Sequence, residues 1–555
     1  MPGYFVENFG CRATQADGAA LERQFEERGM NRASASAQAD VVVLNTCTVT
    51  AAADQDARAA IRRVRRQNPD ARIIVTGCYA QRAPEEIAAL PGVSLVIGNS
   101  HKHQLAEIVS ASGIPSPAGI RLGSVPGGSN AETPSALGWH SASGAAIDLT
   151  ELDGASASAG RSFVPLTTLA AGTRAPDAGS PIFVSDIFAH TELLAAPVFD
   201  AANERTRPNL KVQDGCDNRC SFCVIPYVRG RSRSLDRAEI IHEVNTLVEA
   251  GYREVVISGI NLGRWGRDLQ GPGFSASGFR TSNMLPEEAF RRPQTGSRRP
   301  SFESLIRAIL AETSLDKLRL SSVEPMDWSD ELIALVASSP RIAKHAHVPL
   351  QSGSDAVLRR MHRKYRPWHY REKIEKIRAA MPTAAIGADV MVGFPGETEA
   401  EFEATRRLID ELPFTYLHVF TYSARPGTPA AEMPNQVPVY VARERNRVLR
   451  ELAAEKKLAF MRGFIGKMVE AITLNVVGHA GGGHDGSVEF TEALTDNYLK
   501  LRLRGRYDPN HWMQAGVDGV EDGALVGLTG ATGMLSETTS GSHSNPMMST
   551  PPYSR

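Results

Sequence analysis

Three of the six cysteines lie within eight residues, in the segment CDNRCSFC. Cys216, Cys220 and Cys223 have a C-x3-C-x2-C spacing. Thiolates are the usual ligands of iron–sulfur clusters. Three of them can hold three irons of a four-iron cube and leave the fourth iron open to a chelating small molecule. A structural zinc site needs four ligands, usually in two separated pairs, and the nearest histidine, His242, falls inside a predicted helix. The spacing therefore predicts an iron–sulfur site.

The other three cysteines are far apart in sequence, yet each follows a predicted strand. Cys47 comes directly after the apolar run 41–46, Cys78 comes after 72–77, and Cys11 closes the opening segment. The residues between the two runs have helical spacing, so the order predicts a parallel α/β sheet. Such sheets bind ligands at the carboxyl ends of their strands. We expect these cysteines to converge on a second cluster; the alternative is three buried cysteines that pack as small hydrophobic residues.

Strands and helices alternate again from about residue 206 to 437. The segments EVVISGI, KLRLSSV, HAHVPL, AIGADVMVGF and YLHVFTY are predicted strands, and amphipathic helices separate them. Repeated β/α units predict a full or partial β/α barrel. After a charged helix, short strand-like runs between about 464 and 504 predict a small β-barrel. The fold class is therefore α/β, with a small C-terminal β-barrel.

A chain of 555 residues is too long for one core, and the predicted domains divide it as follows. We expect an N-terminal iron–sulfur domain over 1–108, a low-complexity linker over 109–184, the barrel over 185–437 with a basic insertion near 268–300, a helix with the small barrel over 438–505, and a disordered tail over 506–555. No apolar run is long enough for a membrane helix, and the start lacks a secretory signal. The protein is therefore expected in the reducing cytoplasm, where structural disulfides are rare, so its six cysteines need another explanation. The net charge of −1 argues neither for nor against RNA binding.

The order of motifs resembles the radical S-adenosylmethionine (SAM) tRNA methylthiotransferase family. The matching segments are GC, NTCTVT, GCYAQ, KVQDGCDNRCSFCVIPYVRGRSRS, HVPLQSGSD and GADVMVGFPGET. NTCTVT, LRLSSVEP and FTYLHVFTYSARPGTPAAEM resemble the subgroup that acts on N6-threonylcarbamoyladenosine. The resemblance implies an N-terminal cluster domain, a radical SAM barrel and a C-terminal barrel of the TRAM type.

The resemblance also implies an activity, two 4Fe–4S clusters and SAM as cofactors. Cys216, Cys220 and Cys223 would ligate the cluster that cleaves SAM to a radical, and Cys11, Cys47 and Cys78 would ligate the sulfur-donating cluster. The product would be the methylthio derivative at C2 of N6-threonylcarbamoyladenosine at position 37, next to the anticodon. Expected partners are tRNA, an electron donor such as flavodoxin or ferredoxin, and a sulfur or iron–sulfur delivery system. Thr14 departs from the family pattern, in which many members have asparagine.

Alternatives remain open at this point. A sister methylthiotransferase would act on isopentenyladenosine in tRNA or on an aspartate of a ribosomal protein. A protein of another class would bind RNA and metal without catalysis.

Weaker signals nominate further site residues, although none is predicted to be catalytic beyond the two clusters. Small-residue turns after barrel strands, and an aromatic residue beside the third cysteine, favour cofactor contacts at Phe222, Gly259, Asn261, Glu324, Gln351, Ser352 and Gly393. Basic runs favour RNA phosphate contacts at Arg229, Arg231, Arg233, Arg502 and Arg504. Tyr498 suits either base stacking or core packing.

Overall fold

The computed structural model describes residues 2–112, 180–190, 193, 207–269, 300–480 and 488–534. The chain forms two compact units that interleave in sequence. The first comprises Met1–Glu7, Leu21–Leu44 and Ala59–Ser185, and the second comprises Asn8–Ala20, Asn45–Arg58 and Asp186–Arg555. Most of the predicted linker and insertion, and the end of the predicted tail, lie outside the described residues.

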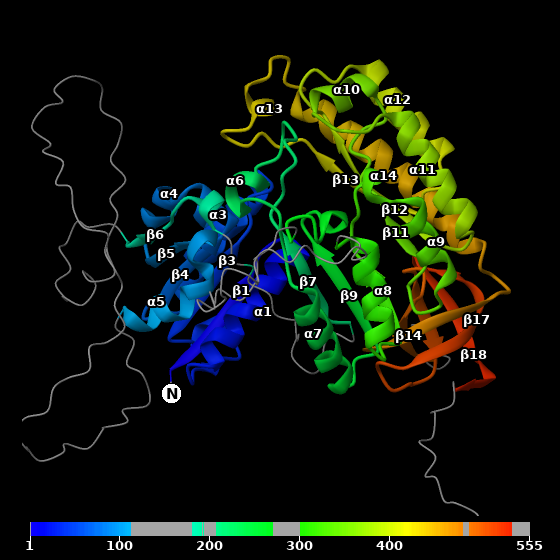
Figure 1. The fold of residues 1–555 in the computed structure, drawn as a ribbon, viewed down its shortest axis with the longest axis horizontal. Coiled ribbons are helices and arrows are strands. Elements are labelled where there is room, and N and C mark those ends of the chain that lie inside the picture. Colours follow the sequence, from blue (N-terminus) through cyan, green and yellow to red (C-terminus); the bar gives the residue numbers. More distant parts are fainter. Residues whose placement is uncertain are drawn as a thin grey trace, which may run out of the picture. The chain divides into compact units, whose positions relative to one another are not determined.

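A six-stranded sheet with the order β2-β1-β3-β4-β5-β6 forms the N-terminal part (Figure 1). Its strands are β1 (Gly3–Asn8), β2 (Asn31–Arg32), β3 (Val41–Thr46), β4 (Arg72–Gly77), β5 (Val93–Gly98) and β6 (Ile182–Phe183). The helices are α1 (Arg12–Glu26), α2 (Ala51–Gln67), α3 (Cys78–Arg82), α4 (Pro84–Ala88) and α5 (Leu105–Ala111). The β1–β2, β4–β5 and β5–β6 pairs are parallel. All six residues of β3 are buried, as its β-branched, apolar sequence predicts.

The β6 strand corrects one predicted boundary. Ile182 and Phe183 fall inside the expected linker, but they pair with Val96 and Ile97 of β5. A two-residue strand lacks the length that makes a strand recognisable from its pattern, so only pairing with β5 defines it.

Six parallel strands of the second unit follow one another in chain order, as expected for a partial β/α barrel. They are β7 (Asn209–Asp214), β9 (Glu254–Gly259), β10 (Lys317–Leu320), β11 (His345–His347), β12 (Ala385–Val392) and β13 (Tyr416–Thr421). A parallel bridge between Ser322 and His347 joins the sheet that contains β10 to the sheet that contains β11. The short strand β8 (Arg233–Ser234) pairs antiparallel with β7.

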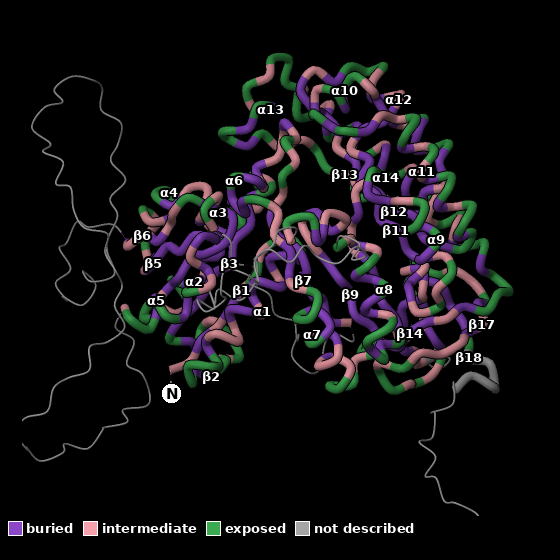
Figure 2. The backbone as a smooth tube through the Cα atoms, viewed as in Figure 1, coloured by how far each residue is buried: buried purple, intermediate pink, exposed green. Residues whose placement is uncertain are grey.

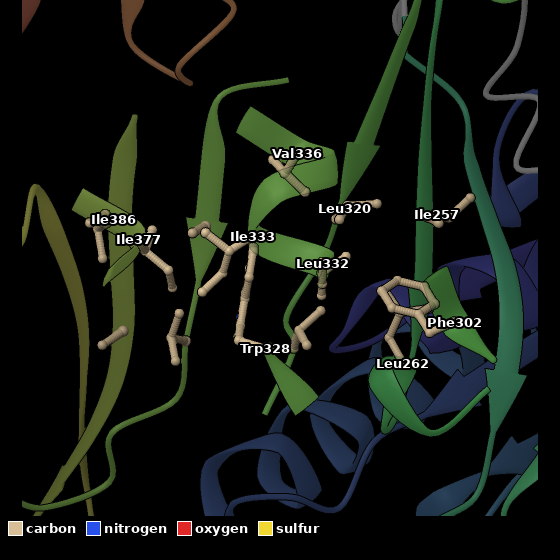
Figure 3. Close-up of a cluster of buried hydrophobic side chains, with 14 of the residues drawn as sticks. Ile257, Leu262, Phe302, Leu320, Trp328, Leu332, Ile333, Val336, Ile377 and Ile386 are labelled. Carbon is tan, nitrogen blue, oxygen red and sulfur yellow. The ribbon is translucent and has the colours of Figure 1, made fainter. Parts of the chain in front are cut away.

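Helices cover these strands, and the core lies between the two layers. The helices are α6 (Ile225–Arg229), α7 (Arg237–Glu249), α8 (Phe302–Glu312), α9 (Asp330–Ser338), α10 (Asp355–Arg360), α11 (Pro367–Ala380), α12 (Glu399–Glu411), α13 (Pro429–Glu432) and α14 (Val439–Arg462). Figure 2 shows β9 and β12 buried along most of their length and α11 exposed on one side. Figure 3 shows part of the core, in which Trp328, Leu332 and Ile333 pack with Phe302 and Leu320.

A closed five-stranded barrel with the order β14-β15-β16-β18-β17 follows α14. Its strands are β14 (Met468–Ala480), β15 (Val488–Thr495), β16 (Lys500–Arg504), β17 (Trp512–Glu521) and β18 (Ala524–Met534). The small β-barrel is therefore confirmed, but the prediction that the disordered tail starts at 506 is wrong. Residues 512–534 supply the last two strands, because β16 needs β18 and β14 needs β17 as hydrogen-bonding partners to close the barrel.

Candidate functional site

A cavity of about 550 Å³ reaches from the loops at the carboxyl ends of the parallel strands of the second unit into the sheet. The loop after β7, the turn after β9, and residues of or just after β10 to β13 all contribute to its lining. This edge is where β/α barrels position reactive groups, because the loops of several strands meet there.

All three cysteines of the C-x3-C-x2-C motif line this cavity. They lie in the loop between β7 and α6, and their sulfur atoms accept hydrogen bonds. The backbone N–H of Asn218 donates to Sγ of Cys216 at 3.4 Å, and Asn261 Nδ2 lies 3.6 Å from the same sulfur. Donors aimed at sulfur stabilise the thiolate form that a cluster requires and tune the cluster that the sulfur holds.

Arg363 is a site residue that the sequence reasoning missed. Its Nη1 donates to Sγ of Cys220 at 3.3 Å, and its Nη2 forms an ion pair with Glu324. Burial lowers the pKa of Arg363, but the charges of Tyr365, Glu324 and Cys220 outweigh burial and raise that pKa well above its ordinary value. Arg363 therefore remains a buried cation beside the motif. The sequence did not indicate Arg363 as a site residue because it lies 140 residues after the motif along the chain.

The surroundings of the three cysteines suit a metal cluster. Burial raises the pKa of Cys223 to about 12 and raises the pKa of Cys216, so both would keep their protons without a cation. A cluster replaces those protons with iron. The converging sulfurs and the surrounding N–H donors therefore suit a thiolate-bound cluster.

We call Cys11, Cys47 and Cys78 the dispersed set, and Cys216, Cys220 and Cys223 the local set. Each cysteine of the dispersed set lies just after a strand, as predicted. Cys11 follows β1, is exposed and lines the same cavity as Cys216, Cys220 and Cys223. Cys47 follows β3 and is buried. The backbone of Gly10 packs against its side chain. Gly10 has a φ of +98°, and an added Cβ there would lie 2.8 Å from Sγ of Cys47.

Cys78 is the third member and belongs to the first unit. It opens α3 directly after β4, is buried, and lies 3.6 Å from Nδ2 of Asn99. Within the described ranges, no group of three His, Cys, Asp or Glu side chains has the arrangement of a site for a single metal ion.

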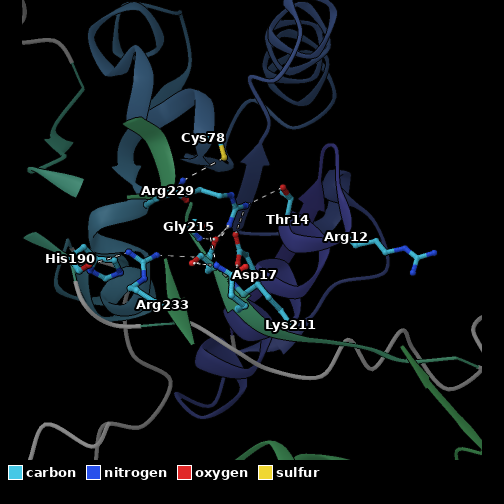
Figure 4. A network of polar contacts seen from close by, with 12 residues as sticks. Arg12, Thr14, Asp17, Cys78, His190, Lys211, Gly215, Arg229 and Arg233 are labelled. Carbon is cyan, nitrogen blue, oxygen red and sulfur yellow. Dashed lines mark hydrogen bonds and ion pairs between the residues drawn. The ribbon is translucent and has the colours of Figure 1, made fainter. Parts of the chain in front are cut away.

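A buried ion-pair network holds α1 to β7 and to the end of α6 (Figure 4). Lys211 pairs with Asp17 and lies 3.0 Å from Asp214, while Arg229 lies 3.0 Å from each of the same two carboxylates. Burial raises the pKa of Asp214, but Arg229 and Lys211 outweigh it and hold that pKa well below its usual range. The prediction that Arg229 contacts RNA is therefore wrong, because its side chain is 2% exposed and already paired.

The other predicted RNA contacts differ in exposure. Arg231 and Arg504 are exposed. Arg233 is largely covered and donates to the carbonyl of His190 at 3.1 Å, and Arg502 pairs with Asp522 at 3.1 Å.

Five of the seven predicted cofactor contacts line the cavity: Phe222, Gly259, Asn261, Glu324 and Gln351. Gln351 has a φ of +66°, a strained conformation that is found most often at functional sites. Two predictions are wrong. Ser352 is fully buried outside the lining and is hydrogen-bonded to Thr405 at 3.1 Å. Gly393 lies against α14, where an added Cβ would be 2.5 Å from Cβ of Ala442, so packing requires the glycine.

No helix in the described part of the chain is long and apolar enough to cross a membrane. Residues 3–98 match the family described as "Uncharacterized protein family UPF0004", and residues 210–409 match the radical SAM superfamily. Among solved structures, the radical SAM methyltransferase TsrM from Kitasatospora setae is a distant likeness, with a TM-score of 0.45 and 16% identity over 77% of this chain and 74% of that chain.

Curated relatives match almost the whole chain. The threonylcarbamoyladenosine tRNA methylthiotransferase MtaB of Bacillus subtilis (strain 168) is 34% identical over 500 residues, which cover 90% of each chain. The protein of the same name from Aquifex aeolicus (strain VF5) is 31% identical over 90% of this chain and 96% of its own. A tRNA-2-methylthio-N(6)-dimethylallyladenosine synthase from Novosphingobium aromaticivorans is 32% identical over 84% of this chain and 85% of its own. With this coverage, the chain belongs to the radical SAM tRNA methylthiotransferase family.

Proposed function

We propose that this protein transfers a methylthio group to C2 of the adenine in N6-threonylcarbamoyladenosine at position 37 of tRNA. The observation that carries the proposal is that Cys11 lines the same cavity as Cys216, Cys220 and Cys223. One member of the dispersed set thus reaches the cavity of the local set, as sulfur transfer to a substrate activated there would require. The names of the relatives from Bacillus subtilis and Aquifex aeolicus favour the threonylcarbamoyl acceptor.

Two 4Fe–4S clusters form part of the proposal. Cys216, Cys220 and Cys223 would hold one, and Cys11, Cys47 and Cys78 would hold the other. With SAM bound, the first cluster supplies the one-electron chemistry that protein side chains cannot provide.

The chain's own residues would bind and orient the reactants in the cavity. Arg363 keeps a positive charge at Cys220, which favours the thiolate. Oδ1 of Asn261 is buried and has no hydrogen-bond partner in the described part of the chain, so it suits a cationic donor such as the ammonium group of SAM. Glu324, fixed by Arg363, offers a second acceptor at the same wall.

The proposed partners follow from this reaction. The exposed Arg231 and Arg504 suit phosphates of the anticodon loop. An electron donor such as flavodoxin or ferredoxin would reduce the first cluster, and a sulfur or iron–sulfur delivery system would restore the second. A tRNA substrate favours the cytoplasm as the place of action.

The test is anaerobic reconstitution with iron and sulfide, followed by incubation with dithionite, SAM and tRNA that carries N6-threonylcarbamoyladenosine. We expect mass spectrometry of the digested tRNA to detect the 2-methylthio nucleoside. If 5′-deoxyadenosine forms without that product, but isopentenyladenosine tRNA is modified, the acceptor is wrong. If protein with both clusters forms neither compound, the enzymatic proposal fails.

A further inference from the structure

Five aromatic or imidazole rings form one wall of the cavity. His345 and His347 come from β11, Tyr416 and His418 come from β13, and Tyr498 comes from the turn before β16. The His345 and Tyr416 rings are nearly parallel, at 4°, with centroids 5.8 Å apart, and Nε2 of His345 lies 2.6 Å from the Tyr416 hydroxyl. The centroid of Tyr498 is 4.9 Å from that of His345. We call these five residues the ring wall.

The ring wall is held in place by groups behind it. Arg319 lies over the Tyr498 ring at 5.3 Å and is itself fixed by Glu254 at 2.6 Å. Burial and the charge of Arg319 lower the pKa of His345 well below its ordinary value, so that ring stays neutral. The nearly parallel, pre-positioned rings of His345 and Tyr416 offer a surface on which a nucleobase can stack.

Arg12 differs from the other arginine of the cavity. Within the described residues, Arg12 and Arg363 are the two arginines of the lining, and Arg363 is paired with Glu324. Arg12 is exposed, and its Nη2 donates to the hydroxyl of Tyr498 at 3.2 Å; across the described part of the chain it has no carboxylate partner. Figure 4 shows its side chain extending away from the ion-pair network that Asp17 of the same helix joins. A guanidinium without a carboxylate partner, beside a stacking surface, suits a planar anion such as a carboxylate.

We infer that the ring wall seats the adenine of the acceptor nucleoside and that Arg12 binds a carboxylate on its N6 substituent. The inference rests on the proposed function and deepens it, because Arg12 would select an adenosine with an anionic N6 group over one with an apolar N6 group. Two placements favour the acceptor over the adenine of SAM. Arg12 is adjacent to Cys11, and Tyr498 comes from the C-terminal barrel rather than from the β/α barrel.

The test uses full-length, cluster-reconstituted protein and three anticodon stem-loops that differ only at position 37. They carry N6-threonylcarbamoyladenosine, N6-isopentenyladenosine or adenosine. Binding is measured by fluorescence anisotropy in the absence of SAM. We expect Arg12→Gln to weaken binding of the threonylcarbamoyl RNA about 10- to 100-fold and to change binding of the other two less than about twofold. Arg12→Lys should keep part of the preference for the threonylcarbamoyl RNA. Arg447→Gln, on the exposed face of α14, should not change binding of any of the three RNAs.

Tyr498→Ala should weaken binding of all three RNAs by a similar factor, about 10-fold, because stacking does not depend on the N6 group. An equal loss for all three RNAs in Arg12→Gln would make Arg12 a phosphate contact and overturn the inference. A raised KM for SAM in Tyr498→Ala with unchanged RNA binding would assign the ring wall to SAM instead. Iron content and melting temperature verify that each variant is folded and loaded. If wild-type protein prefers the threonylcarbamoyl RNA through Arg12 but yields no methylthio product, the proposed function fails and the binding inference stands.

Discussion

The two sets of cysteines differ in what holds them. Cys216, Cys220 and Cys223 share one loop. Asn261, just after β9, and Arg363, between α10 and α11, donate to their sulfurs. The dispersed set comes from three separate strand ends, with Cys11 and Cys47 in the second unit and Cys78 in the first. The first set therefore depends on a loop and its immediate neighbours. The second depends on the ends of strands that are far apart in sequence.

The largest expected effect separates the two sets directly. Cys220→Ala should reduce cleavage of SAM to the background of cluster-free protein, because the reducing cluster loses a ligand. Cys47→Ala should leave 5′-deoxyadenosine formation intact and abolish the methylthio product. Both compounds are measured by mass spectrometry in the same reaction. Normal SAM cleavage in Cys220→Ala would contradict the assignment of Cys216, Cys220 and Cys223 to the cluster that cleaves SAM. Intact methylthiolation in Cys47→Ala would contradict the assignment of the dispersed set to the sulfur-donating cluster.

The next test concerns the buried network of ion pairs that joins α1 to β7. Asp17→Asn leaves Lys211 and Arg229 with one carboxylate fewer, and breaking a buried ion pair typically costs about 3–5 kcal/mol. We expect an earlier urea unfolding transition for this variant. Glu403→Gln, which breaks an exposed pair with Arg406, is the matched control and should unfold at the wild-type midpoint. Equal midpoints for all three proteins would contradict a stabilising role for the network.

Arg363 should matter to the local set alone. Arg363→Gln removes the donor to Cys220 and the partner of Glu324. Loss of a group that supports a metal ligand typically lowers metal affinity or activity about 10- to 100-fold. The expected result is slower 5′-deoxyadenosine formation together with a shifted reduction potential of the first cluster. Arg359→Gln, in an exposed pair with Asp355, serves as the control. An unshifted potential would mean that Arg363 acts only through protein stability.

Gly10 should matter to the dispersed set alone. Gly10→Ala places a Cβ 2.8 Å from Sγ of Cys47 in a left-handed conformation, and such strain costs about 1–3 kcal/mol. We expect less iron bound by the dispersed set and unchanged SAM cleavage. Gly29 also has a positive φ, +72°, but nothing lies within 4 Å of its added Cβ, so Gly29→Ala separates backbone strain from the contact. If both variants lose iron equally, the contact with Cys47 is not the cause.

The smallest effect concerns pH and the ring wall. Because the pKa of His345 is lower in the folded protein than its ordinary value of 6.5, the unfolded chain takes up the proton first as the pH falls. Its contribution to stability is therefore complete above about pH 6.5 and decreases below, by up to about 1.4 kcal/mol per pH unit. His345→Gln should flatten that slope in urea unfolding between pH 7 and 5. His242→Gln, at an exposed site on α7, should leave the slope unchanged.

Local spacing and short apolar runs were sufficient to predict several strands and the local cysteine motif of this protein. The strands 41–46 and 72–77 were predicted with the bounds that the structure has, because β-branched runs that end in turn residues admit few other structures. The motif around Cys216 predicted three cysteines that line one cavity, because all three lie on one loop. The domain limits and site roles that the structure does not contradict stay predictions.

Other features depend on contacts between residues that are distant in sequence. The strand β7 was missed because Lys211 and Gln213 are polar, yet both are buried, and Asp17 neutralises Lys211 from nearly 200 residues away. Arg229 was wrongly predicted to contact RNA, since a basic run does not reveal which of its members faces a buried carboxylate. Sequence by itself determined the local motif, the strand pattern and the family, because each is written in neighbouring residues. Only the tertiary structure decided which charges are paired and which, like Arg12, remain available, because the partners of a buried charge are chosen by the fold rather than by the chain order.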